Sequence, residues 1–288
     1  MLGTAALSLR GPAQPTDVLM TKVFSEKVFV GLLLVAVATL VFLQWLPLAN
    51  AAGLIVLTGA LWVRQGLSLS RWQKSLLWCL IAPLAFWIAT YRPEGFSYPL
   101  VFGLVGDSGA MPRYEFFANL GKGICGFLLL YFLWSKRHDD EFTAAPKHQF
   151  LMALLAPTAV IGLAIPVLEL HLQPKGIEKI ALFALGNLLI ICVAEEAFMR
   201  LLLQQSLRNA IAVVTDNRWV QELVPLVVVT AIFVAIHSGL SGAAIWVYAL
   251  AGFLYGLSYT LSKNIFYPIM IHFFVNQIHF SFLTYPLG

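Results

Sequence analysis

Long apolar runs follow one another along most of the chain, and they constrain its fold more than any other feature. A helix that crosses a lipid bilayer needs about 20 consecutive, mainly apolar residues. The runs predict nine helices, near residues 28–47, 51–67, 74–90, 115–135, 149–169, 177–205, 222–238, 242–262 and 265–284. The second run is short and closely follows the first, so we expect a bundle of eight or nine transmembrane helices.

Composition agrees with a membrane protein and argues against other classes. The chain is 60% hydrophobic and only 11% charged, whereas soluble domains are about 25% charged. Its formal net charge of +4 is not gathered in a basic run, so the lipid bilayer is an expected partner and nucleic acid is not. We predict an all-α, polytopic integral membrane protein of undefined oligomeric state. Its single membrane domain is expected at residues 25–288, after a flexible or surface segment at residues 1–24.

The loops between the predicted helices indicate their orientation, because lysine and arginine are enriched in cytoplasmic loops. Nine spans with a cytoplasmic N-terminus leave few such residues in outer loops: Arg92, Arg113, Lys175 and Lys179. We expect the protein in the plasma (inner) membrane. We expect no cleavable signal peptide, because the first residues lack the longer apolar region that such a peptide has. The longest outer loop, residues 92–115, is interpreted as a lid, a re-entrant turn or a linker.

Three ionisable residues interrupt the apolar run ICVAEEAFMR, namely Glu195, Glu196 and Arg200. An ionised side chain at the bilayer centre costs roughly 2.5–3.5 kcal/mol, so such groups usually face a cavity and have a function there. On a helix, Glu196 and Arg200 share a face and can pair. Glu195 points about 100° away and stays free to accept or donate a proton. The alternative is a helix end in water, with a solvated ion pair.

Two later helices carry polar residues at the same four-residue spacing. The sequence FVAIH places Phe233 and His237 one turn apart, and HFFVN does the same for His272 and Asn276. A lone histidine in a membrane helix is commonly a hydrogen-bonded packing residue. Together with Glu195, however, these helices can supply one cavity with a base, a second proton carrier and donors for an oxyanion. No covalent nucleophile accompanies them, so water is the expected attacking group.

The predicted helix ends place Glu195 and His237 at different depths in the membrane. At a rise of 1.5 Å per residue, the difference is about 10 Å. A shared cavity therefore requires that the helix at 222–238 begins deep in the membrane, or that the SGLSG sequence after His237 turns inside the protein.

Three motifs on successive helices carry a resemblance to a known family: Glu195-Glu196-x-x-x-Arg200, Phe233-x-x-x-His237 and His272-x-x-x-Asn276. The chain resembles the CAAX-processing and bacteriocin-processing family, also called CPBP or Abi, of glutamic-type intramembrane proteases. The type II CAAX prenyl endopeptidases belong to that family. The resemblance extends from about Asn187 to His279, and we place the catalytic core at residues 177–285.

The resemblance implies an intramembrane endopeptidase that hydrolyses a peptide bond of a membrane-associated protein or peptide. In the family pattern Glu195 is the general base that activates water, and His237 holds or polarises that water. His272 and Asn276 stabilise the oxyanion. The substrate is expected within the membrane, as a prenylated CAAX tail or a bacteriocin-type leader peptide.

The same resemblance gives the remaining motif residues supporting roles. Glu196 and Arg200 orient the first motif, and Glu196 also counts among the candidate catalytic residues. Phe233 packs against the site one turn before His237 and positions it.

The residues leave the metal dependence of such a protease open. One glutamate and two histidines are possible zinc ligands, and a zinc-bound water is also a hydrolytic nucleophile. No HExxH motif is present, and single cysteines lie inside apolar segments, at Cys79, Cys125 and Cys192. We favour a mechanism without a cofactor, with a zinc-dependent version of the protease as the alternative.

Two other classes of function compete with this interpretation. A rhomboid-like serine protease would use Ser241 in GLSG, with His272 or His279 as its base, although Ser241 also fits as the N-cap of the following helix. A non-catalytic immunity, transport or scaffold protein would use the polar cluster for binding. An intramembrane aspartyl protease is not expected, because Asp107 lies in the outer loop and has no second intramembrane aspartate as partner.

Overall fold

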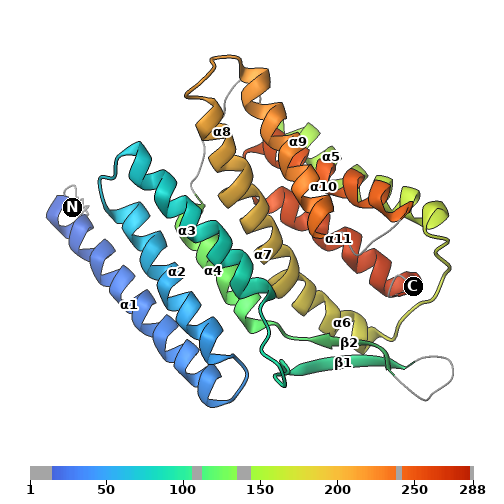
Figure 1. Cartoon of the computed structure of the whole chain (residues 1–288). Coiled ribbons are helices and arrows are strands. Elements are labelled where there is room, and N and C mark those ends of the chain that lie inside the picture. Colours follow the sequence, from blue (N-terminus) through green and yellow to red (C-terminus); the bar gives the residue numbers. More distant parts are fainter. Residues whose placement is uncertain (1–14, 106–111, 135–143, 238–241, 286–288) are drawn as a thin grey trace, which may run out of the picture.

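The computed structural model describes residues 15–105, 112–134, 144–237 and 242–285. Within these ranges the chain is a bundle of helices with one β-hairpin across one end (Figure 1). The N-terminal group of helices consists of α1 (Pro15–Phe42), α2 (Leu48–Gly66), α3 (Arg71–Thr90) and α4 (Leu120–Leu133). The C-terminal group consists of α5 (Pro146–Val167), α9 (Arg218–Ile236), α10 (Ala244–Ser262) and α11 (Phe266–Phe282).

One long helical segment lies between these two groups and packs against both. Its successive α-helical and π-helical stretches are α6 (Ile177–Gly186), η1 (Asn187–Cys192), α7 (Val193–Glu196), η2 (Ala197–Gln204) and α8 (Gln205–Ile211). Val193 and Leu201 belong to the buried core shared with α1–α4, whereas Met199 belongs to the core shared with α5, α9, α10 and α11. The motif with the two glutamates therefore lies in the middle of the molecule.

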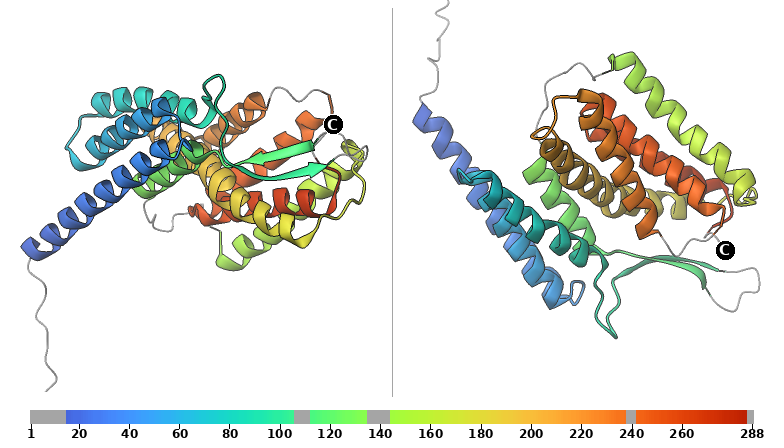
Figure 2. Two further views of the ribbon diagram at one scale, coloured as in Figure 1. Left: turned by 90° about the horizontal axis from the view of Figure 1, so that it is seen from below. Right: turned by 45° about the horizontal axis from the view of Figure 1, so that its top comes forward.

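Helix α1 begins earlier than the apolar pattern predicted. Its first residue is Pro15, and proline is favoured at the first helical position because its missing N–H needs no partner there. Residues 15–24, which we expected in a flexible or surface segment, are therefore helical, and residues 1–14 lie outside the described residues. Figure 2 shows this end of α1 standing clear of the other helices. An apolar run marks where a helix is buried in lipid or protein, and it does not mark where the helix begins.

The loop predicted at residues 92–115 contains a β-hairpin, within a described chain that is otherwise mainly helical and agrees with the all-α prediction. Strands β1 (Leu100–Val105) and β2 (Pro112–Phe117) pair in antiparallel fashion. The helix expected at 115–135 begins only at Leu120. Its N-cap is Asn119, whose side chain accepts a hydrogen bond from a backbone N–H of the first turn.

Aromatic residues attach this hairpin to the helices. Phe102 and Phe116 are partners in the strand register, and both are buried against Phe183 of α6 and Phe280 of α11. A Cβ atom at Gly186 would lie 2.2 Å from the Phe116 ring, so only glycine permits this approach. The hairpin is thus a packed part of the fold rather than a linker.

Five helical segments are long and apolar enough to cross a membrane: α3, α5, the segment Ile177–Ile211, α9 and α10. Shorter apolar helical stretches occur at Val28–Phe42 and Leu120–Leu133. Large hydrophobic side chains such as Phe42 and Trp246 are exposed on the outside of the bundle, as expected where lipid is the solvent. The chain is therefore an integral membrane protein. Every predicted apolar run coincides with a described helix, while the count of eight or nine spans and the cytoplasmic N-terminus stay predictions.

Candidate active site

Residues from all three sequence motifs meet at one cavity of about 370 Å³. The motif residues in its wall are Glu195 of α7, Phe233 and His237 at the end of α9, and His272 and Asn276 of α11. The difference in depth that the predicted helix ends implied does not keep Glu195 and His237 apart. Glu196 and Arg200 do not line the cavity, and both are fully buried beside it.

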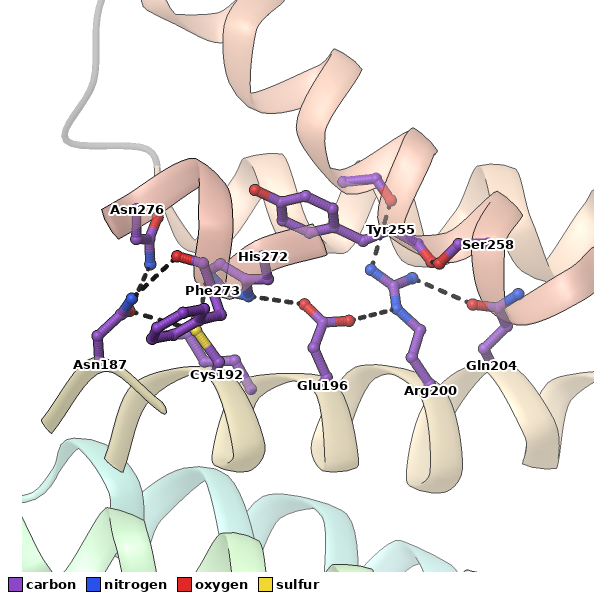
Figure 3. A network of polar contacts seen from close by, with 12 residues as sticks. Asn187, Cys192, Glu196, Arg200, Gln204, Tyr255, Ser258, His272, Phe273 and Asn276 are labelled. Carbon is purple, nitrogen blue, oxygen red and sulfur yellow. Dashed lines mark hydrogen bonds and ion pairs between the residues drawn. The ribbon is translucent and has the colours of Figure 1, made fainter. Parts of the chain in front are cut away.

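The central helix presents its two adjacent glutamates in different directions. Val193–Glu196 is α-helical, whereas the stretches before and after it are π-helical. Such π turns are frequent at functional sites because they change the direction of the side chains that follow. Glu196, Arg200 and Gln204 point together from the helix toward α10 and α11 (Figure 3). Glu195 faces the cavity and α4.

A buried ion pair anchors the first motif, as the four-residue spacing predicted. The Arg200 Nε donates to Glu196 Oε2 at 2.8 Å, and both side chains are fully buried. Further donors of Arg200 bond to Gln204 Oε1 and to the Gly252 carbonyl of α10. A Cβ atom at Gly256 would lie 2.8 Å from Arg200 Nη1, so glycine makes room for the guanidinium. Each end of the ion pair thus has hydrogen-bond partners, which a buried charge requires.

The second carboxylate oxygen of Glu196 fixes His272. The His272 Nδ1 lies 2.8 Å from Glu196 Oε1, and a carboxylate oxygen can only accept, so Nδ1 carries the hydrogen. In a neutral imidazole Nε2 is then an acceptor, and it lies 3.9 Å from Glu195 Oε2. The ring is stacked on Tyr255 of α10, with centroids 4.7 Å apart and planes 18° apart. His272 therefore connects the two glutamates.

His237 is held in a similar way at the end of α9. Its Nδ1 lies 2.7 Å from the Phe233 carbonyl oxygen, which can only accept, so Nδ1 again carries the hydrogen. The imidazole is stacked on Tyr248 at 4.7 Å and packs against the Phe233 ring at 4.6 Å. Phe233 is buried and lies against His237, while its role in positioning the site stays a prediction. A Cβ atom at Gly252 would lie 2.7 Å from the Phe233 ring, so α10 must present a glycine there.

Asn276 is oriented by Asn187, a residue that sequence reasoning missed. The Asn276 Nδ2 donates to Asn187 Oδ1 at 3.0 Å, and Asn187 Nδ2 donates to the Phe273 carbonyl at 3.2 Å. Asn187 is fully buried, and Cys192 donates from Sγ to the same Oδ1. The indication in the sequence was that Asn187 is a single asparagine in the apolar run before the two glutamates.

Lys122 is the second residue that sequence reasoning missed. Its Nζ lies 2.6 Å from Glu195 Oε1, and both side chains are largely buried. One turn further along α4, a Cβ atom at Gly126 would lie 2.4 Å from the Ala194 Cα, so glycine brings α4 close to the glutamates. The available signal was the single lysine in the apolar helix predicted at 115–135. An isolated intramembrane cation marks a functional site when it has a partner.

Two tyrosines outside the helices, one in the cavity wall and one in the hairpin, contact each other. Tyr285 lines the cavity, and its ring packs against Tyr114 of β2 at 4.8 Å. Burial raises the pKa of both hydroxyl groups above the ordinary value of tyrosine. The two side chains therefore stay uncharged at neutral and moderately alkaline pH.

The residues that the serine protease, aspartyl protease and zinc-dependent alternatives would use are described less fully or have other contacts. Ser241 and Asp107 lie outside the described residues. His279 lines the cavity, but its Nε2 is 3.1 Å from the Thr284 carbonyl. In the described ranges, no three His, Cys, Asp or Glu side chains form a group that could hold a metal ion.

The fold and the cavity together define the class of protein. It is an integral membrane protein whose helices enclose a cavity lined by carboxylate, imidazole and amide groups. Residues 177–278, about a third of the chain, match the model of a family described as type II CAAX prenyl endopeptidase Rce1-like. This segment contains all three motifs, and the match confirms the predicted resemblance to the CAAX-processing proteases. Searches among curated proteins and among solved structures returned no significant match.

Proposed function

We propose that the protein is a glutamic-type intramembrane endopeptidase in which Glu195 activates a water molecule. The observation that carries the proposal is the 3.9 Å separation of Glu195 Oε2 and His272 Nε2 at the cavity. One water molecule can bridge two acceptors at this separation, and the Rce1-like match indicates a protease of the CAAX type.

The hydrogen bonds around Glu195 suit the role of general base. Lys122 occupies Oε1, which leaves Oε2 to take a proton from the attacking water and to pass it to the leaving amine. The Nδ1-protonated tautomer of His272 makes its Nε2 an acceptor for the second water hydrogen. We therefore assign His272 to holding the water, beside His237, rather than to the oxyanion as the resemblance implied. Asn276 keeps the oxyanion role through its second amide hydrogen.

The proposed substrate is a peptide or a segment of a membrane-associated protein. A cavity of about 370 Å³ accommodates a few residues around a scissile bond rather than a folded domain. Its wall combines the polar groups above with apolar side chains such as Val160 and Val247. The name of the matched family makes a prenylated CAAX tail the first substrate to try.

Cleavage of a defined peptide tests the proposal. The full chain, purified in detergent and reconstituted in liposomes, is mixed with an internally quenched, farnesylated CAAX peptide. We expect cleavage by the wild type and by Ser241→Ala, and none above background by Glu195→Gln. Equal cleavage by wild type and Glu195→Gln would contradict the glutamate mechanism, and loss of cleavage in Ser241→Ala would favour the serine protease.

Metal dependence is tested on the same preparation. We propose a mechanism without a metal cofactor, so dialysis against 1,10-phenanthroline followed by removal of the chelator should leave the cleavage rate unchanged. A loss of activity that only added zinc restores would select the zinc-dependent version, with Glu195 and the two histidines as candidate ligands.

A further inference from the structure

The groups that line the cavity include more acceptors than donors near the proposed water. The Glu195 carboxylate accepts hydrogen bonds. His237 and His272 each use the hydrogen on Nδ1 for a bond away from the cavity, so their Nε2 atoms are acceptors in the neutral imidazoles. Hydrolysis of a peptide bond, however, places negative charge on the carbonyl oxygen, which needs hydrogen-bond donors. Asn276 offers one hydrogen besides the one it gives to Asn187.

Tyr255 carries a further donor into this cavity. Its side chain is only 1% exposed, and it lines the same cavity as Glu195 and His272. Figure 3 shows its hydroxyl at the end of the ring that points away from Arg200 and toward the Asn276 end of the network. The hydroxyl has no hydrogen-bond partner among the described residues. Because buried hydroxyl groups are normally paired, this one is available to a molecule in the cavity.

The position of the Tyr255 ring is fixed from two sides. One face is stacked on His272, with 18° between the planes, and Phe233 meets it edge-on at 6.1 Å. Helix α10 supplies a similar ring two turns earlier, Tyr248, which is stacked on His237. Tyr255 is the one that lies against the imidazole close to Glu195. A donor held by packing in this way needs no rearrangement as charge develops.

We propose that the Tyr255 hydroxyl is an oxyanion donor of the protease, acting together with Asn276; this assignment rests on the proposed function. Water forms a bond to the carbonyl carbon while its proton moves to Glu195, and the carbonyl π electrons move onto oxygen. That oxygen accepts hydrogen bonds from Tyr255 and Asn276, and the tyrosine keeps its proton. When the electrons return, the C–N bond breaks and the amine takes the proton from Glu195.

The variant Tyr255→Phe removes the hydroxyl and keeps the stacked ring. With the quenched farnesylated CAAX peptide, kcat should fall by about 10²-fold, as for the loss of one oxyanion donor elsewhere, while KM stays within about twofold. Tyr259→Phe is the matched control. Tyr259 is buried one turn further along α10, and its hydroxyl bonds to Gln205 Oε1 instead of facing the cavity. This control should leave kcat unchanged.

A pair of inhibitors separates an oxyanion donor from a residue that only supports the site. A farnesylated peptide aldehyde forms a tetrahedral hydrate, whereas the matching alcohol does not. Tyr255→Phe should weaken inhibition by the aldehyde at least about tenfold and leave the alcohol unchanged. An equal loss for both, or a kcat within twofold of wild type while Glu195→Gln is inactive, overturns the assignment and leaves the protease proposal standing. A wild-type protein that cleaves no faster than Glu195→Gln contradicts both.

Discussion

Among the described residues, two glutamates with buried side chains each contact two partners, and one of the two, Glu196, lies next to the cavity-lining Glu195. Glu222 of α9 lies between Arg208 Nε at 2.5 Å and Lys263 Nζ at 2.7 Å. This cluster joins α8, α9 and the end of α10. Glu196 lies between Arg200 and His272, joining the central helix to α11. Both carboxylates have both of their oxygens occupied.

The difference lies in what surrounds each cluster. Beside Glu196 the chain places Glu195, which bonds to Lys122 through one oxygen and has the other directed toward the cavity and His272. Glu222, Arg208 and Lys263 line neither of the two cavities that Glu195 and His237 line. A buried ion pair by itself therefore indicates a structural clamp. A carboxylate with an unoccupied oxygen facing a cavity indicates chemistry.

Replacing Glu195 or Glu222 by glutamine should give the largest difference between the two regions, in kcat and in stability. Glu195→Gln should lower kcat at least about 10³-fold, because it removes the general base. It should cost less stability than Glu222→Gln, because the Glu195–Lys122 pair is partly exposed and a glutamine oxygen still accepts from Lys122. Glu222→Gln should keep kcat within a few-fold of wild type. It should lower the free energy of unfolding by about 3 kcal/mol, since it removes the buried charge that both Arg208 and Lys263 contact. Peptide cleavage and thermal unfolding in detergent measure the two effects.

The opposite result would contradict the assignment of Glu195 to catalysis and of Glu222 to structure. A Glu195→Gln protein that is strongly destabilised, or a Glu222→Gln protein that folds normally but cleaves nothing, would assign the chemistry to the other region.

Glu196 should show both kinds of effect, because it belongs to the clamp and also orients His272. Glu196→Gln leaves the fully buried Arg200 without its counter-ion, so stability should fall by about 3 kcal/mol. It also leaves one accepting oxygen for two donors, Arg200 Nε and His272 Nδ1, so the His272 tautomer is no longer fixed and kcat should fall by about 10²-fold.

Adding Arg200→Met to Glu196→Gln separates the two contributions. Replacing a whole buried ion pair by uncharged groups is often neutral for stability, so the double variant should regain most of the unfolding temperature. It should not regain activity. Recovery of both would show that Glu196 acts only through folding.

The sequence predicted the helices and the convergence of the motifs, because both depend on simple periodicity. An apolar run of bilayer length identifies a helix, and a four-residue spacing places Glu196 with Arg200 and Phe233 with His237. The hairpin was not predicted, because its strands are short and its aromatic residues resemble those of a membrane-facing loop. Only the contacts of Phe102 and Phe116 with residues far along the chain reveal it.

The residues that orient the site were harder to predict for a related reason. Lys122 and Asn187 belong to no spaced pair, and each acts on a partner from another motif. The approach of α4 depends on Gly126, and a glycine in an apolar helix has many possible explanations. The π turns leave no mark in the apolar pattern either, since the run continues through them.

Lys122 gives a smaller expected effect than the glutamates, because it positions Glu195 and does not touch the substrate. Lys122→Met should lower kcat by about 10- to 50-fold with little change in KM, since the Glu195 side chain loses the bond that directs Oε2 to the cavity. Lys122→Arg should restore part of the activity, because a cation is retained with a different shape. A fully active Lys122→Met protein would show that Lys122 and helix α4 contribute nothing to catalysis.

Asn187 should give the smallest effect, and its size depends on Asn276. Asn187→Ala removes the acceptor that orients the Asn276 amide, so kcat should fall by about three- to tenfold. In a protein that already carries Asn276→Ala, the same change should have almost no further effect on kcat, because residues that act as a unit are not additive. The four proteins of this double-mutant cycle are compared in the peptide assay. Independent losses would mean that Asn187 only supports packing of the central helix against α11, which would make this contact resemble the Glu222 cluster rather than the active site.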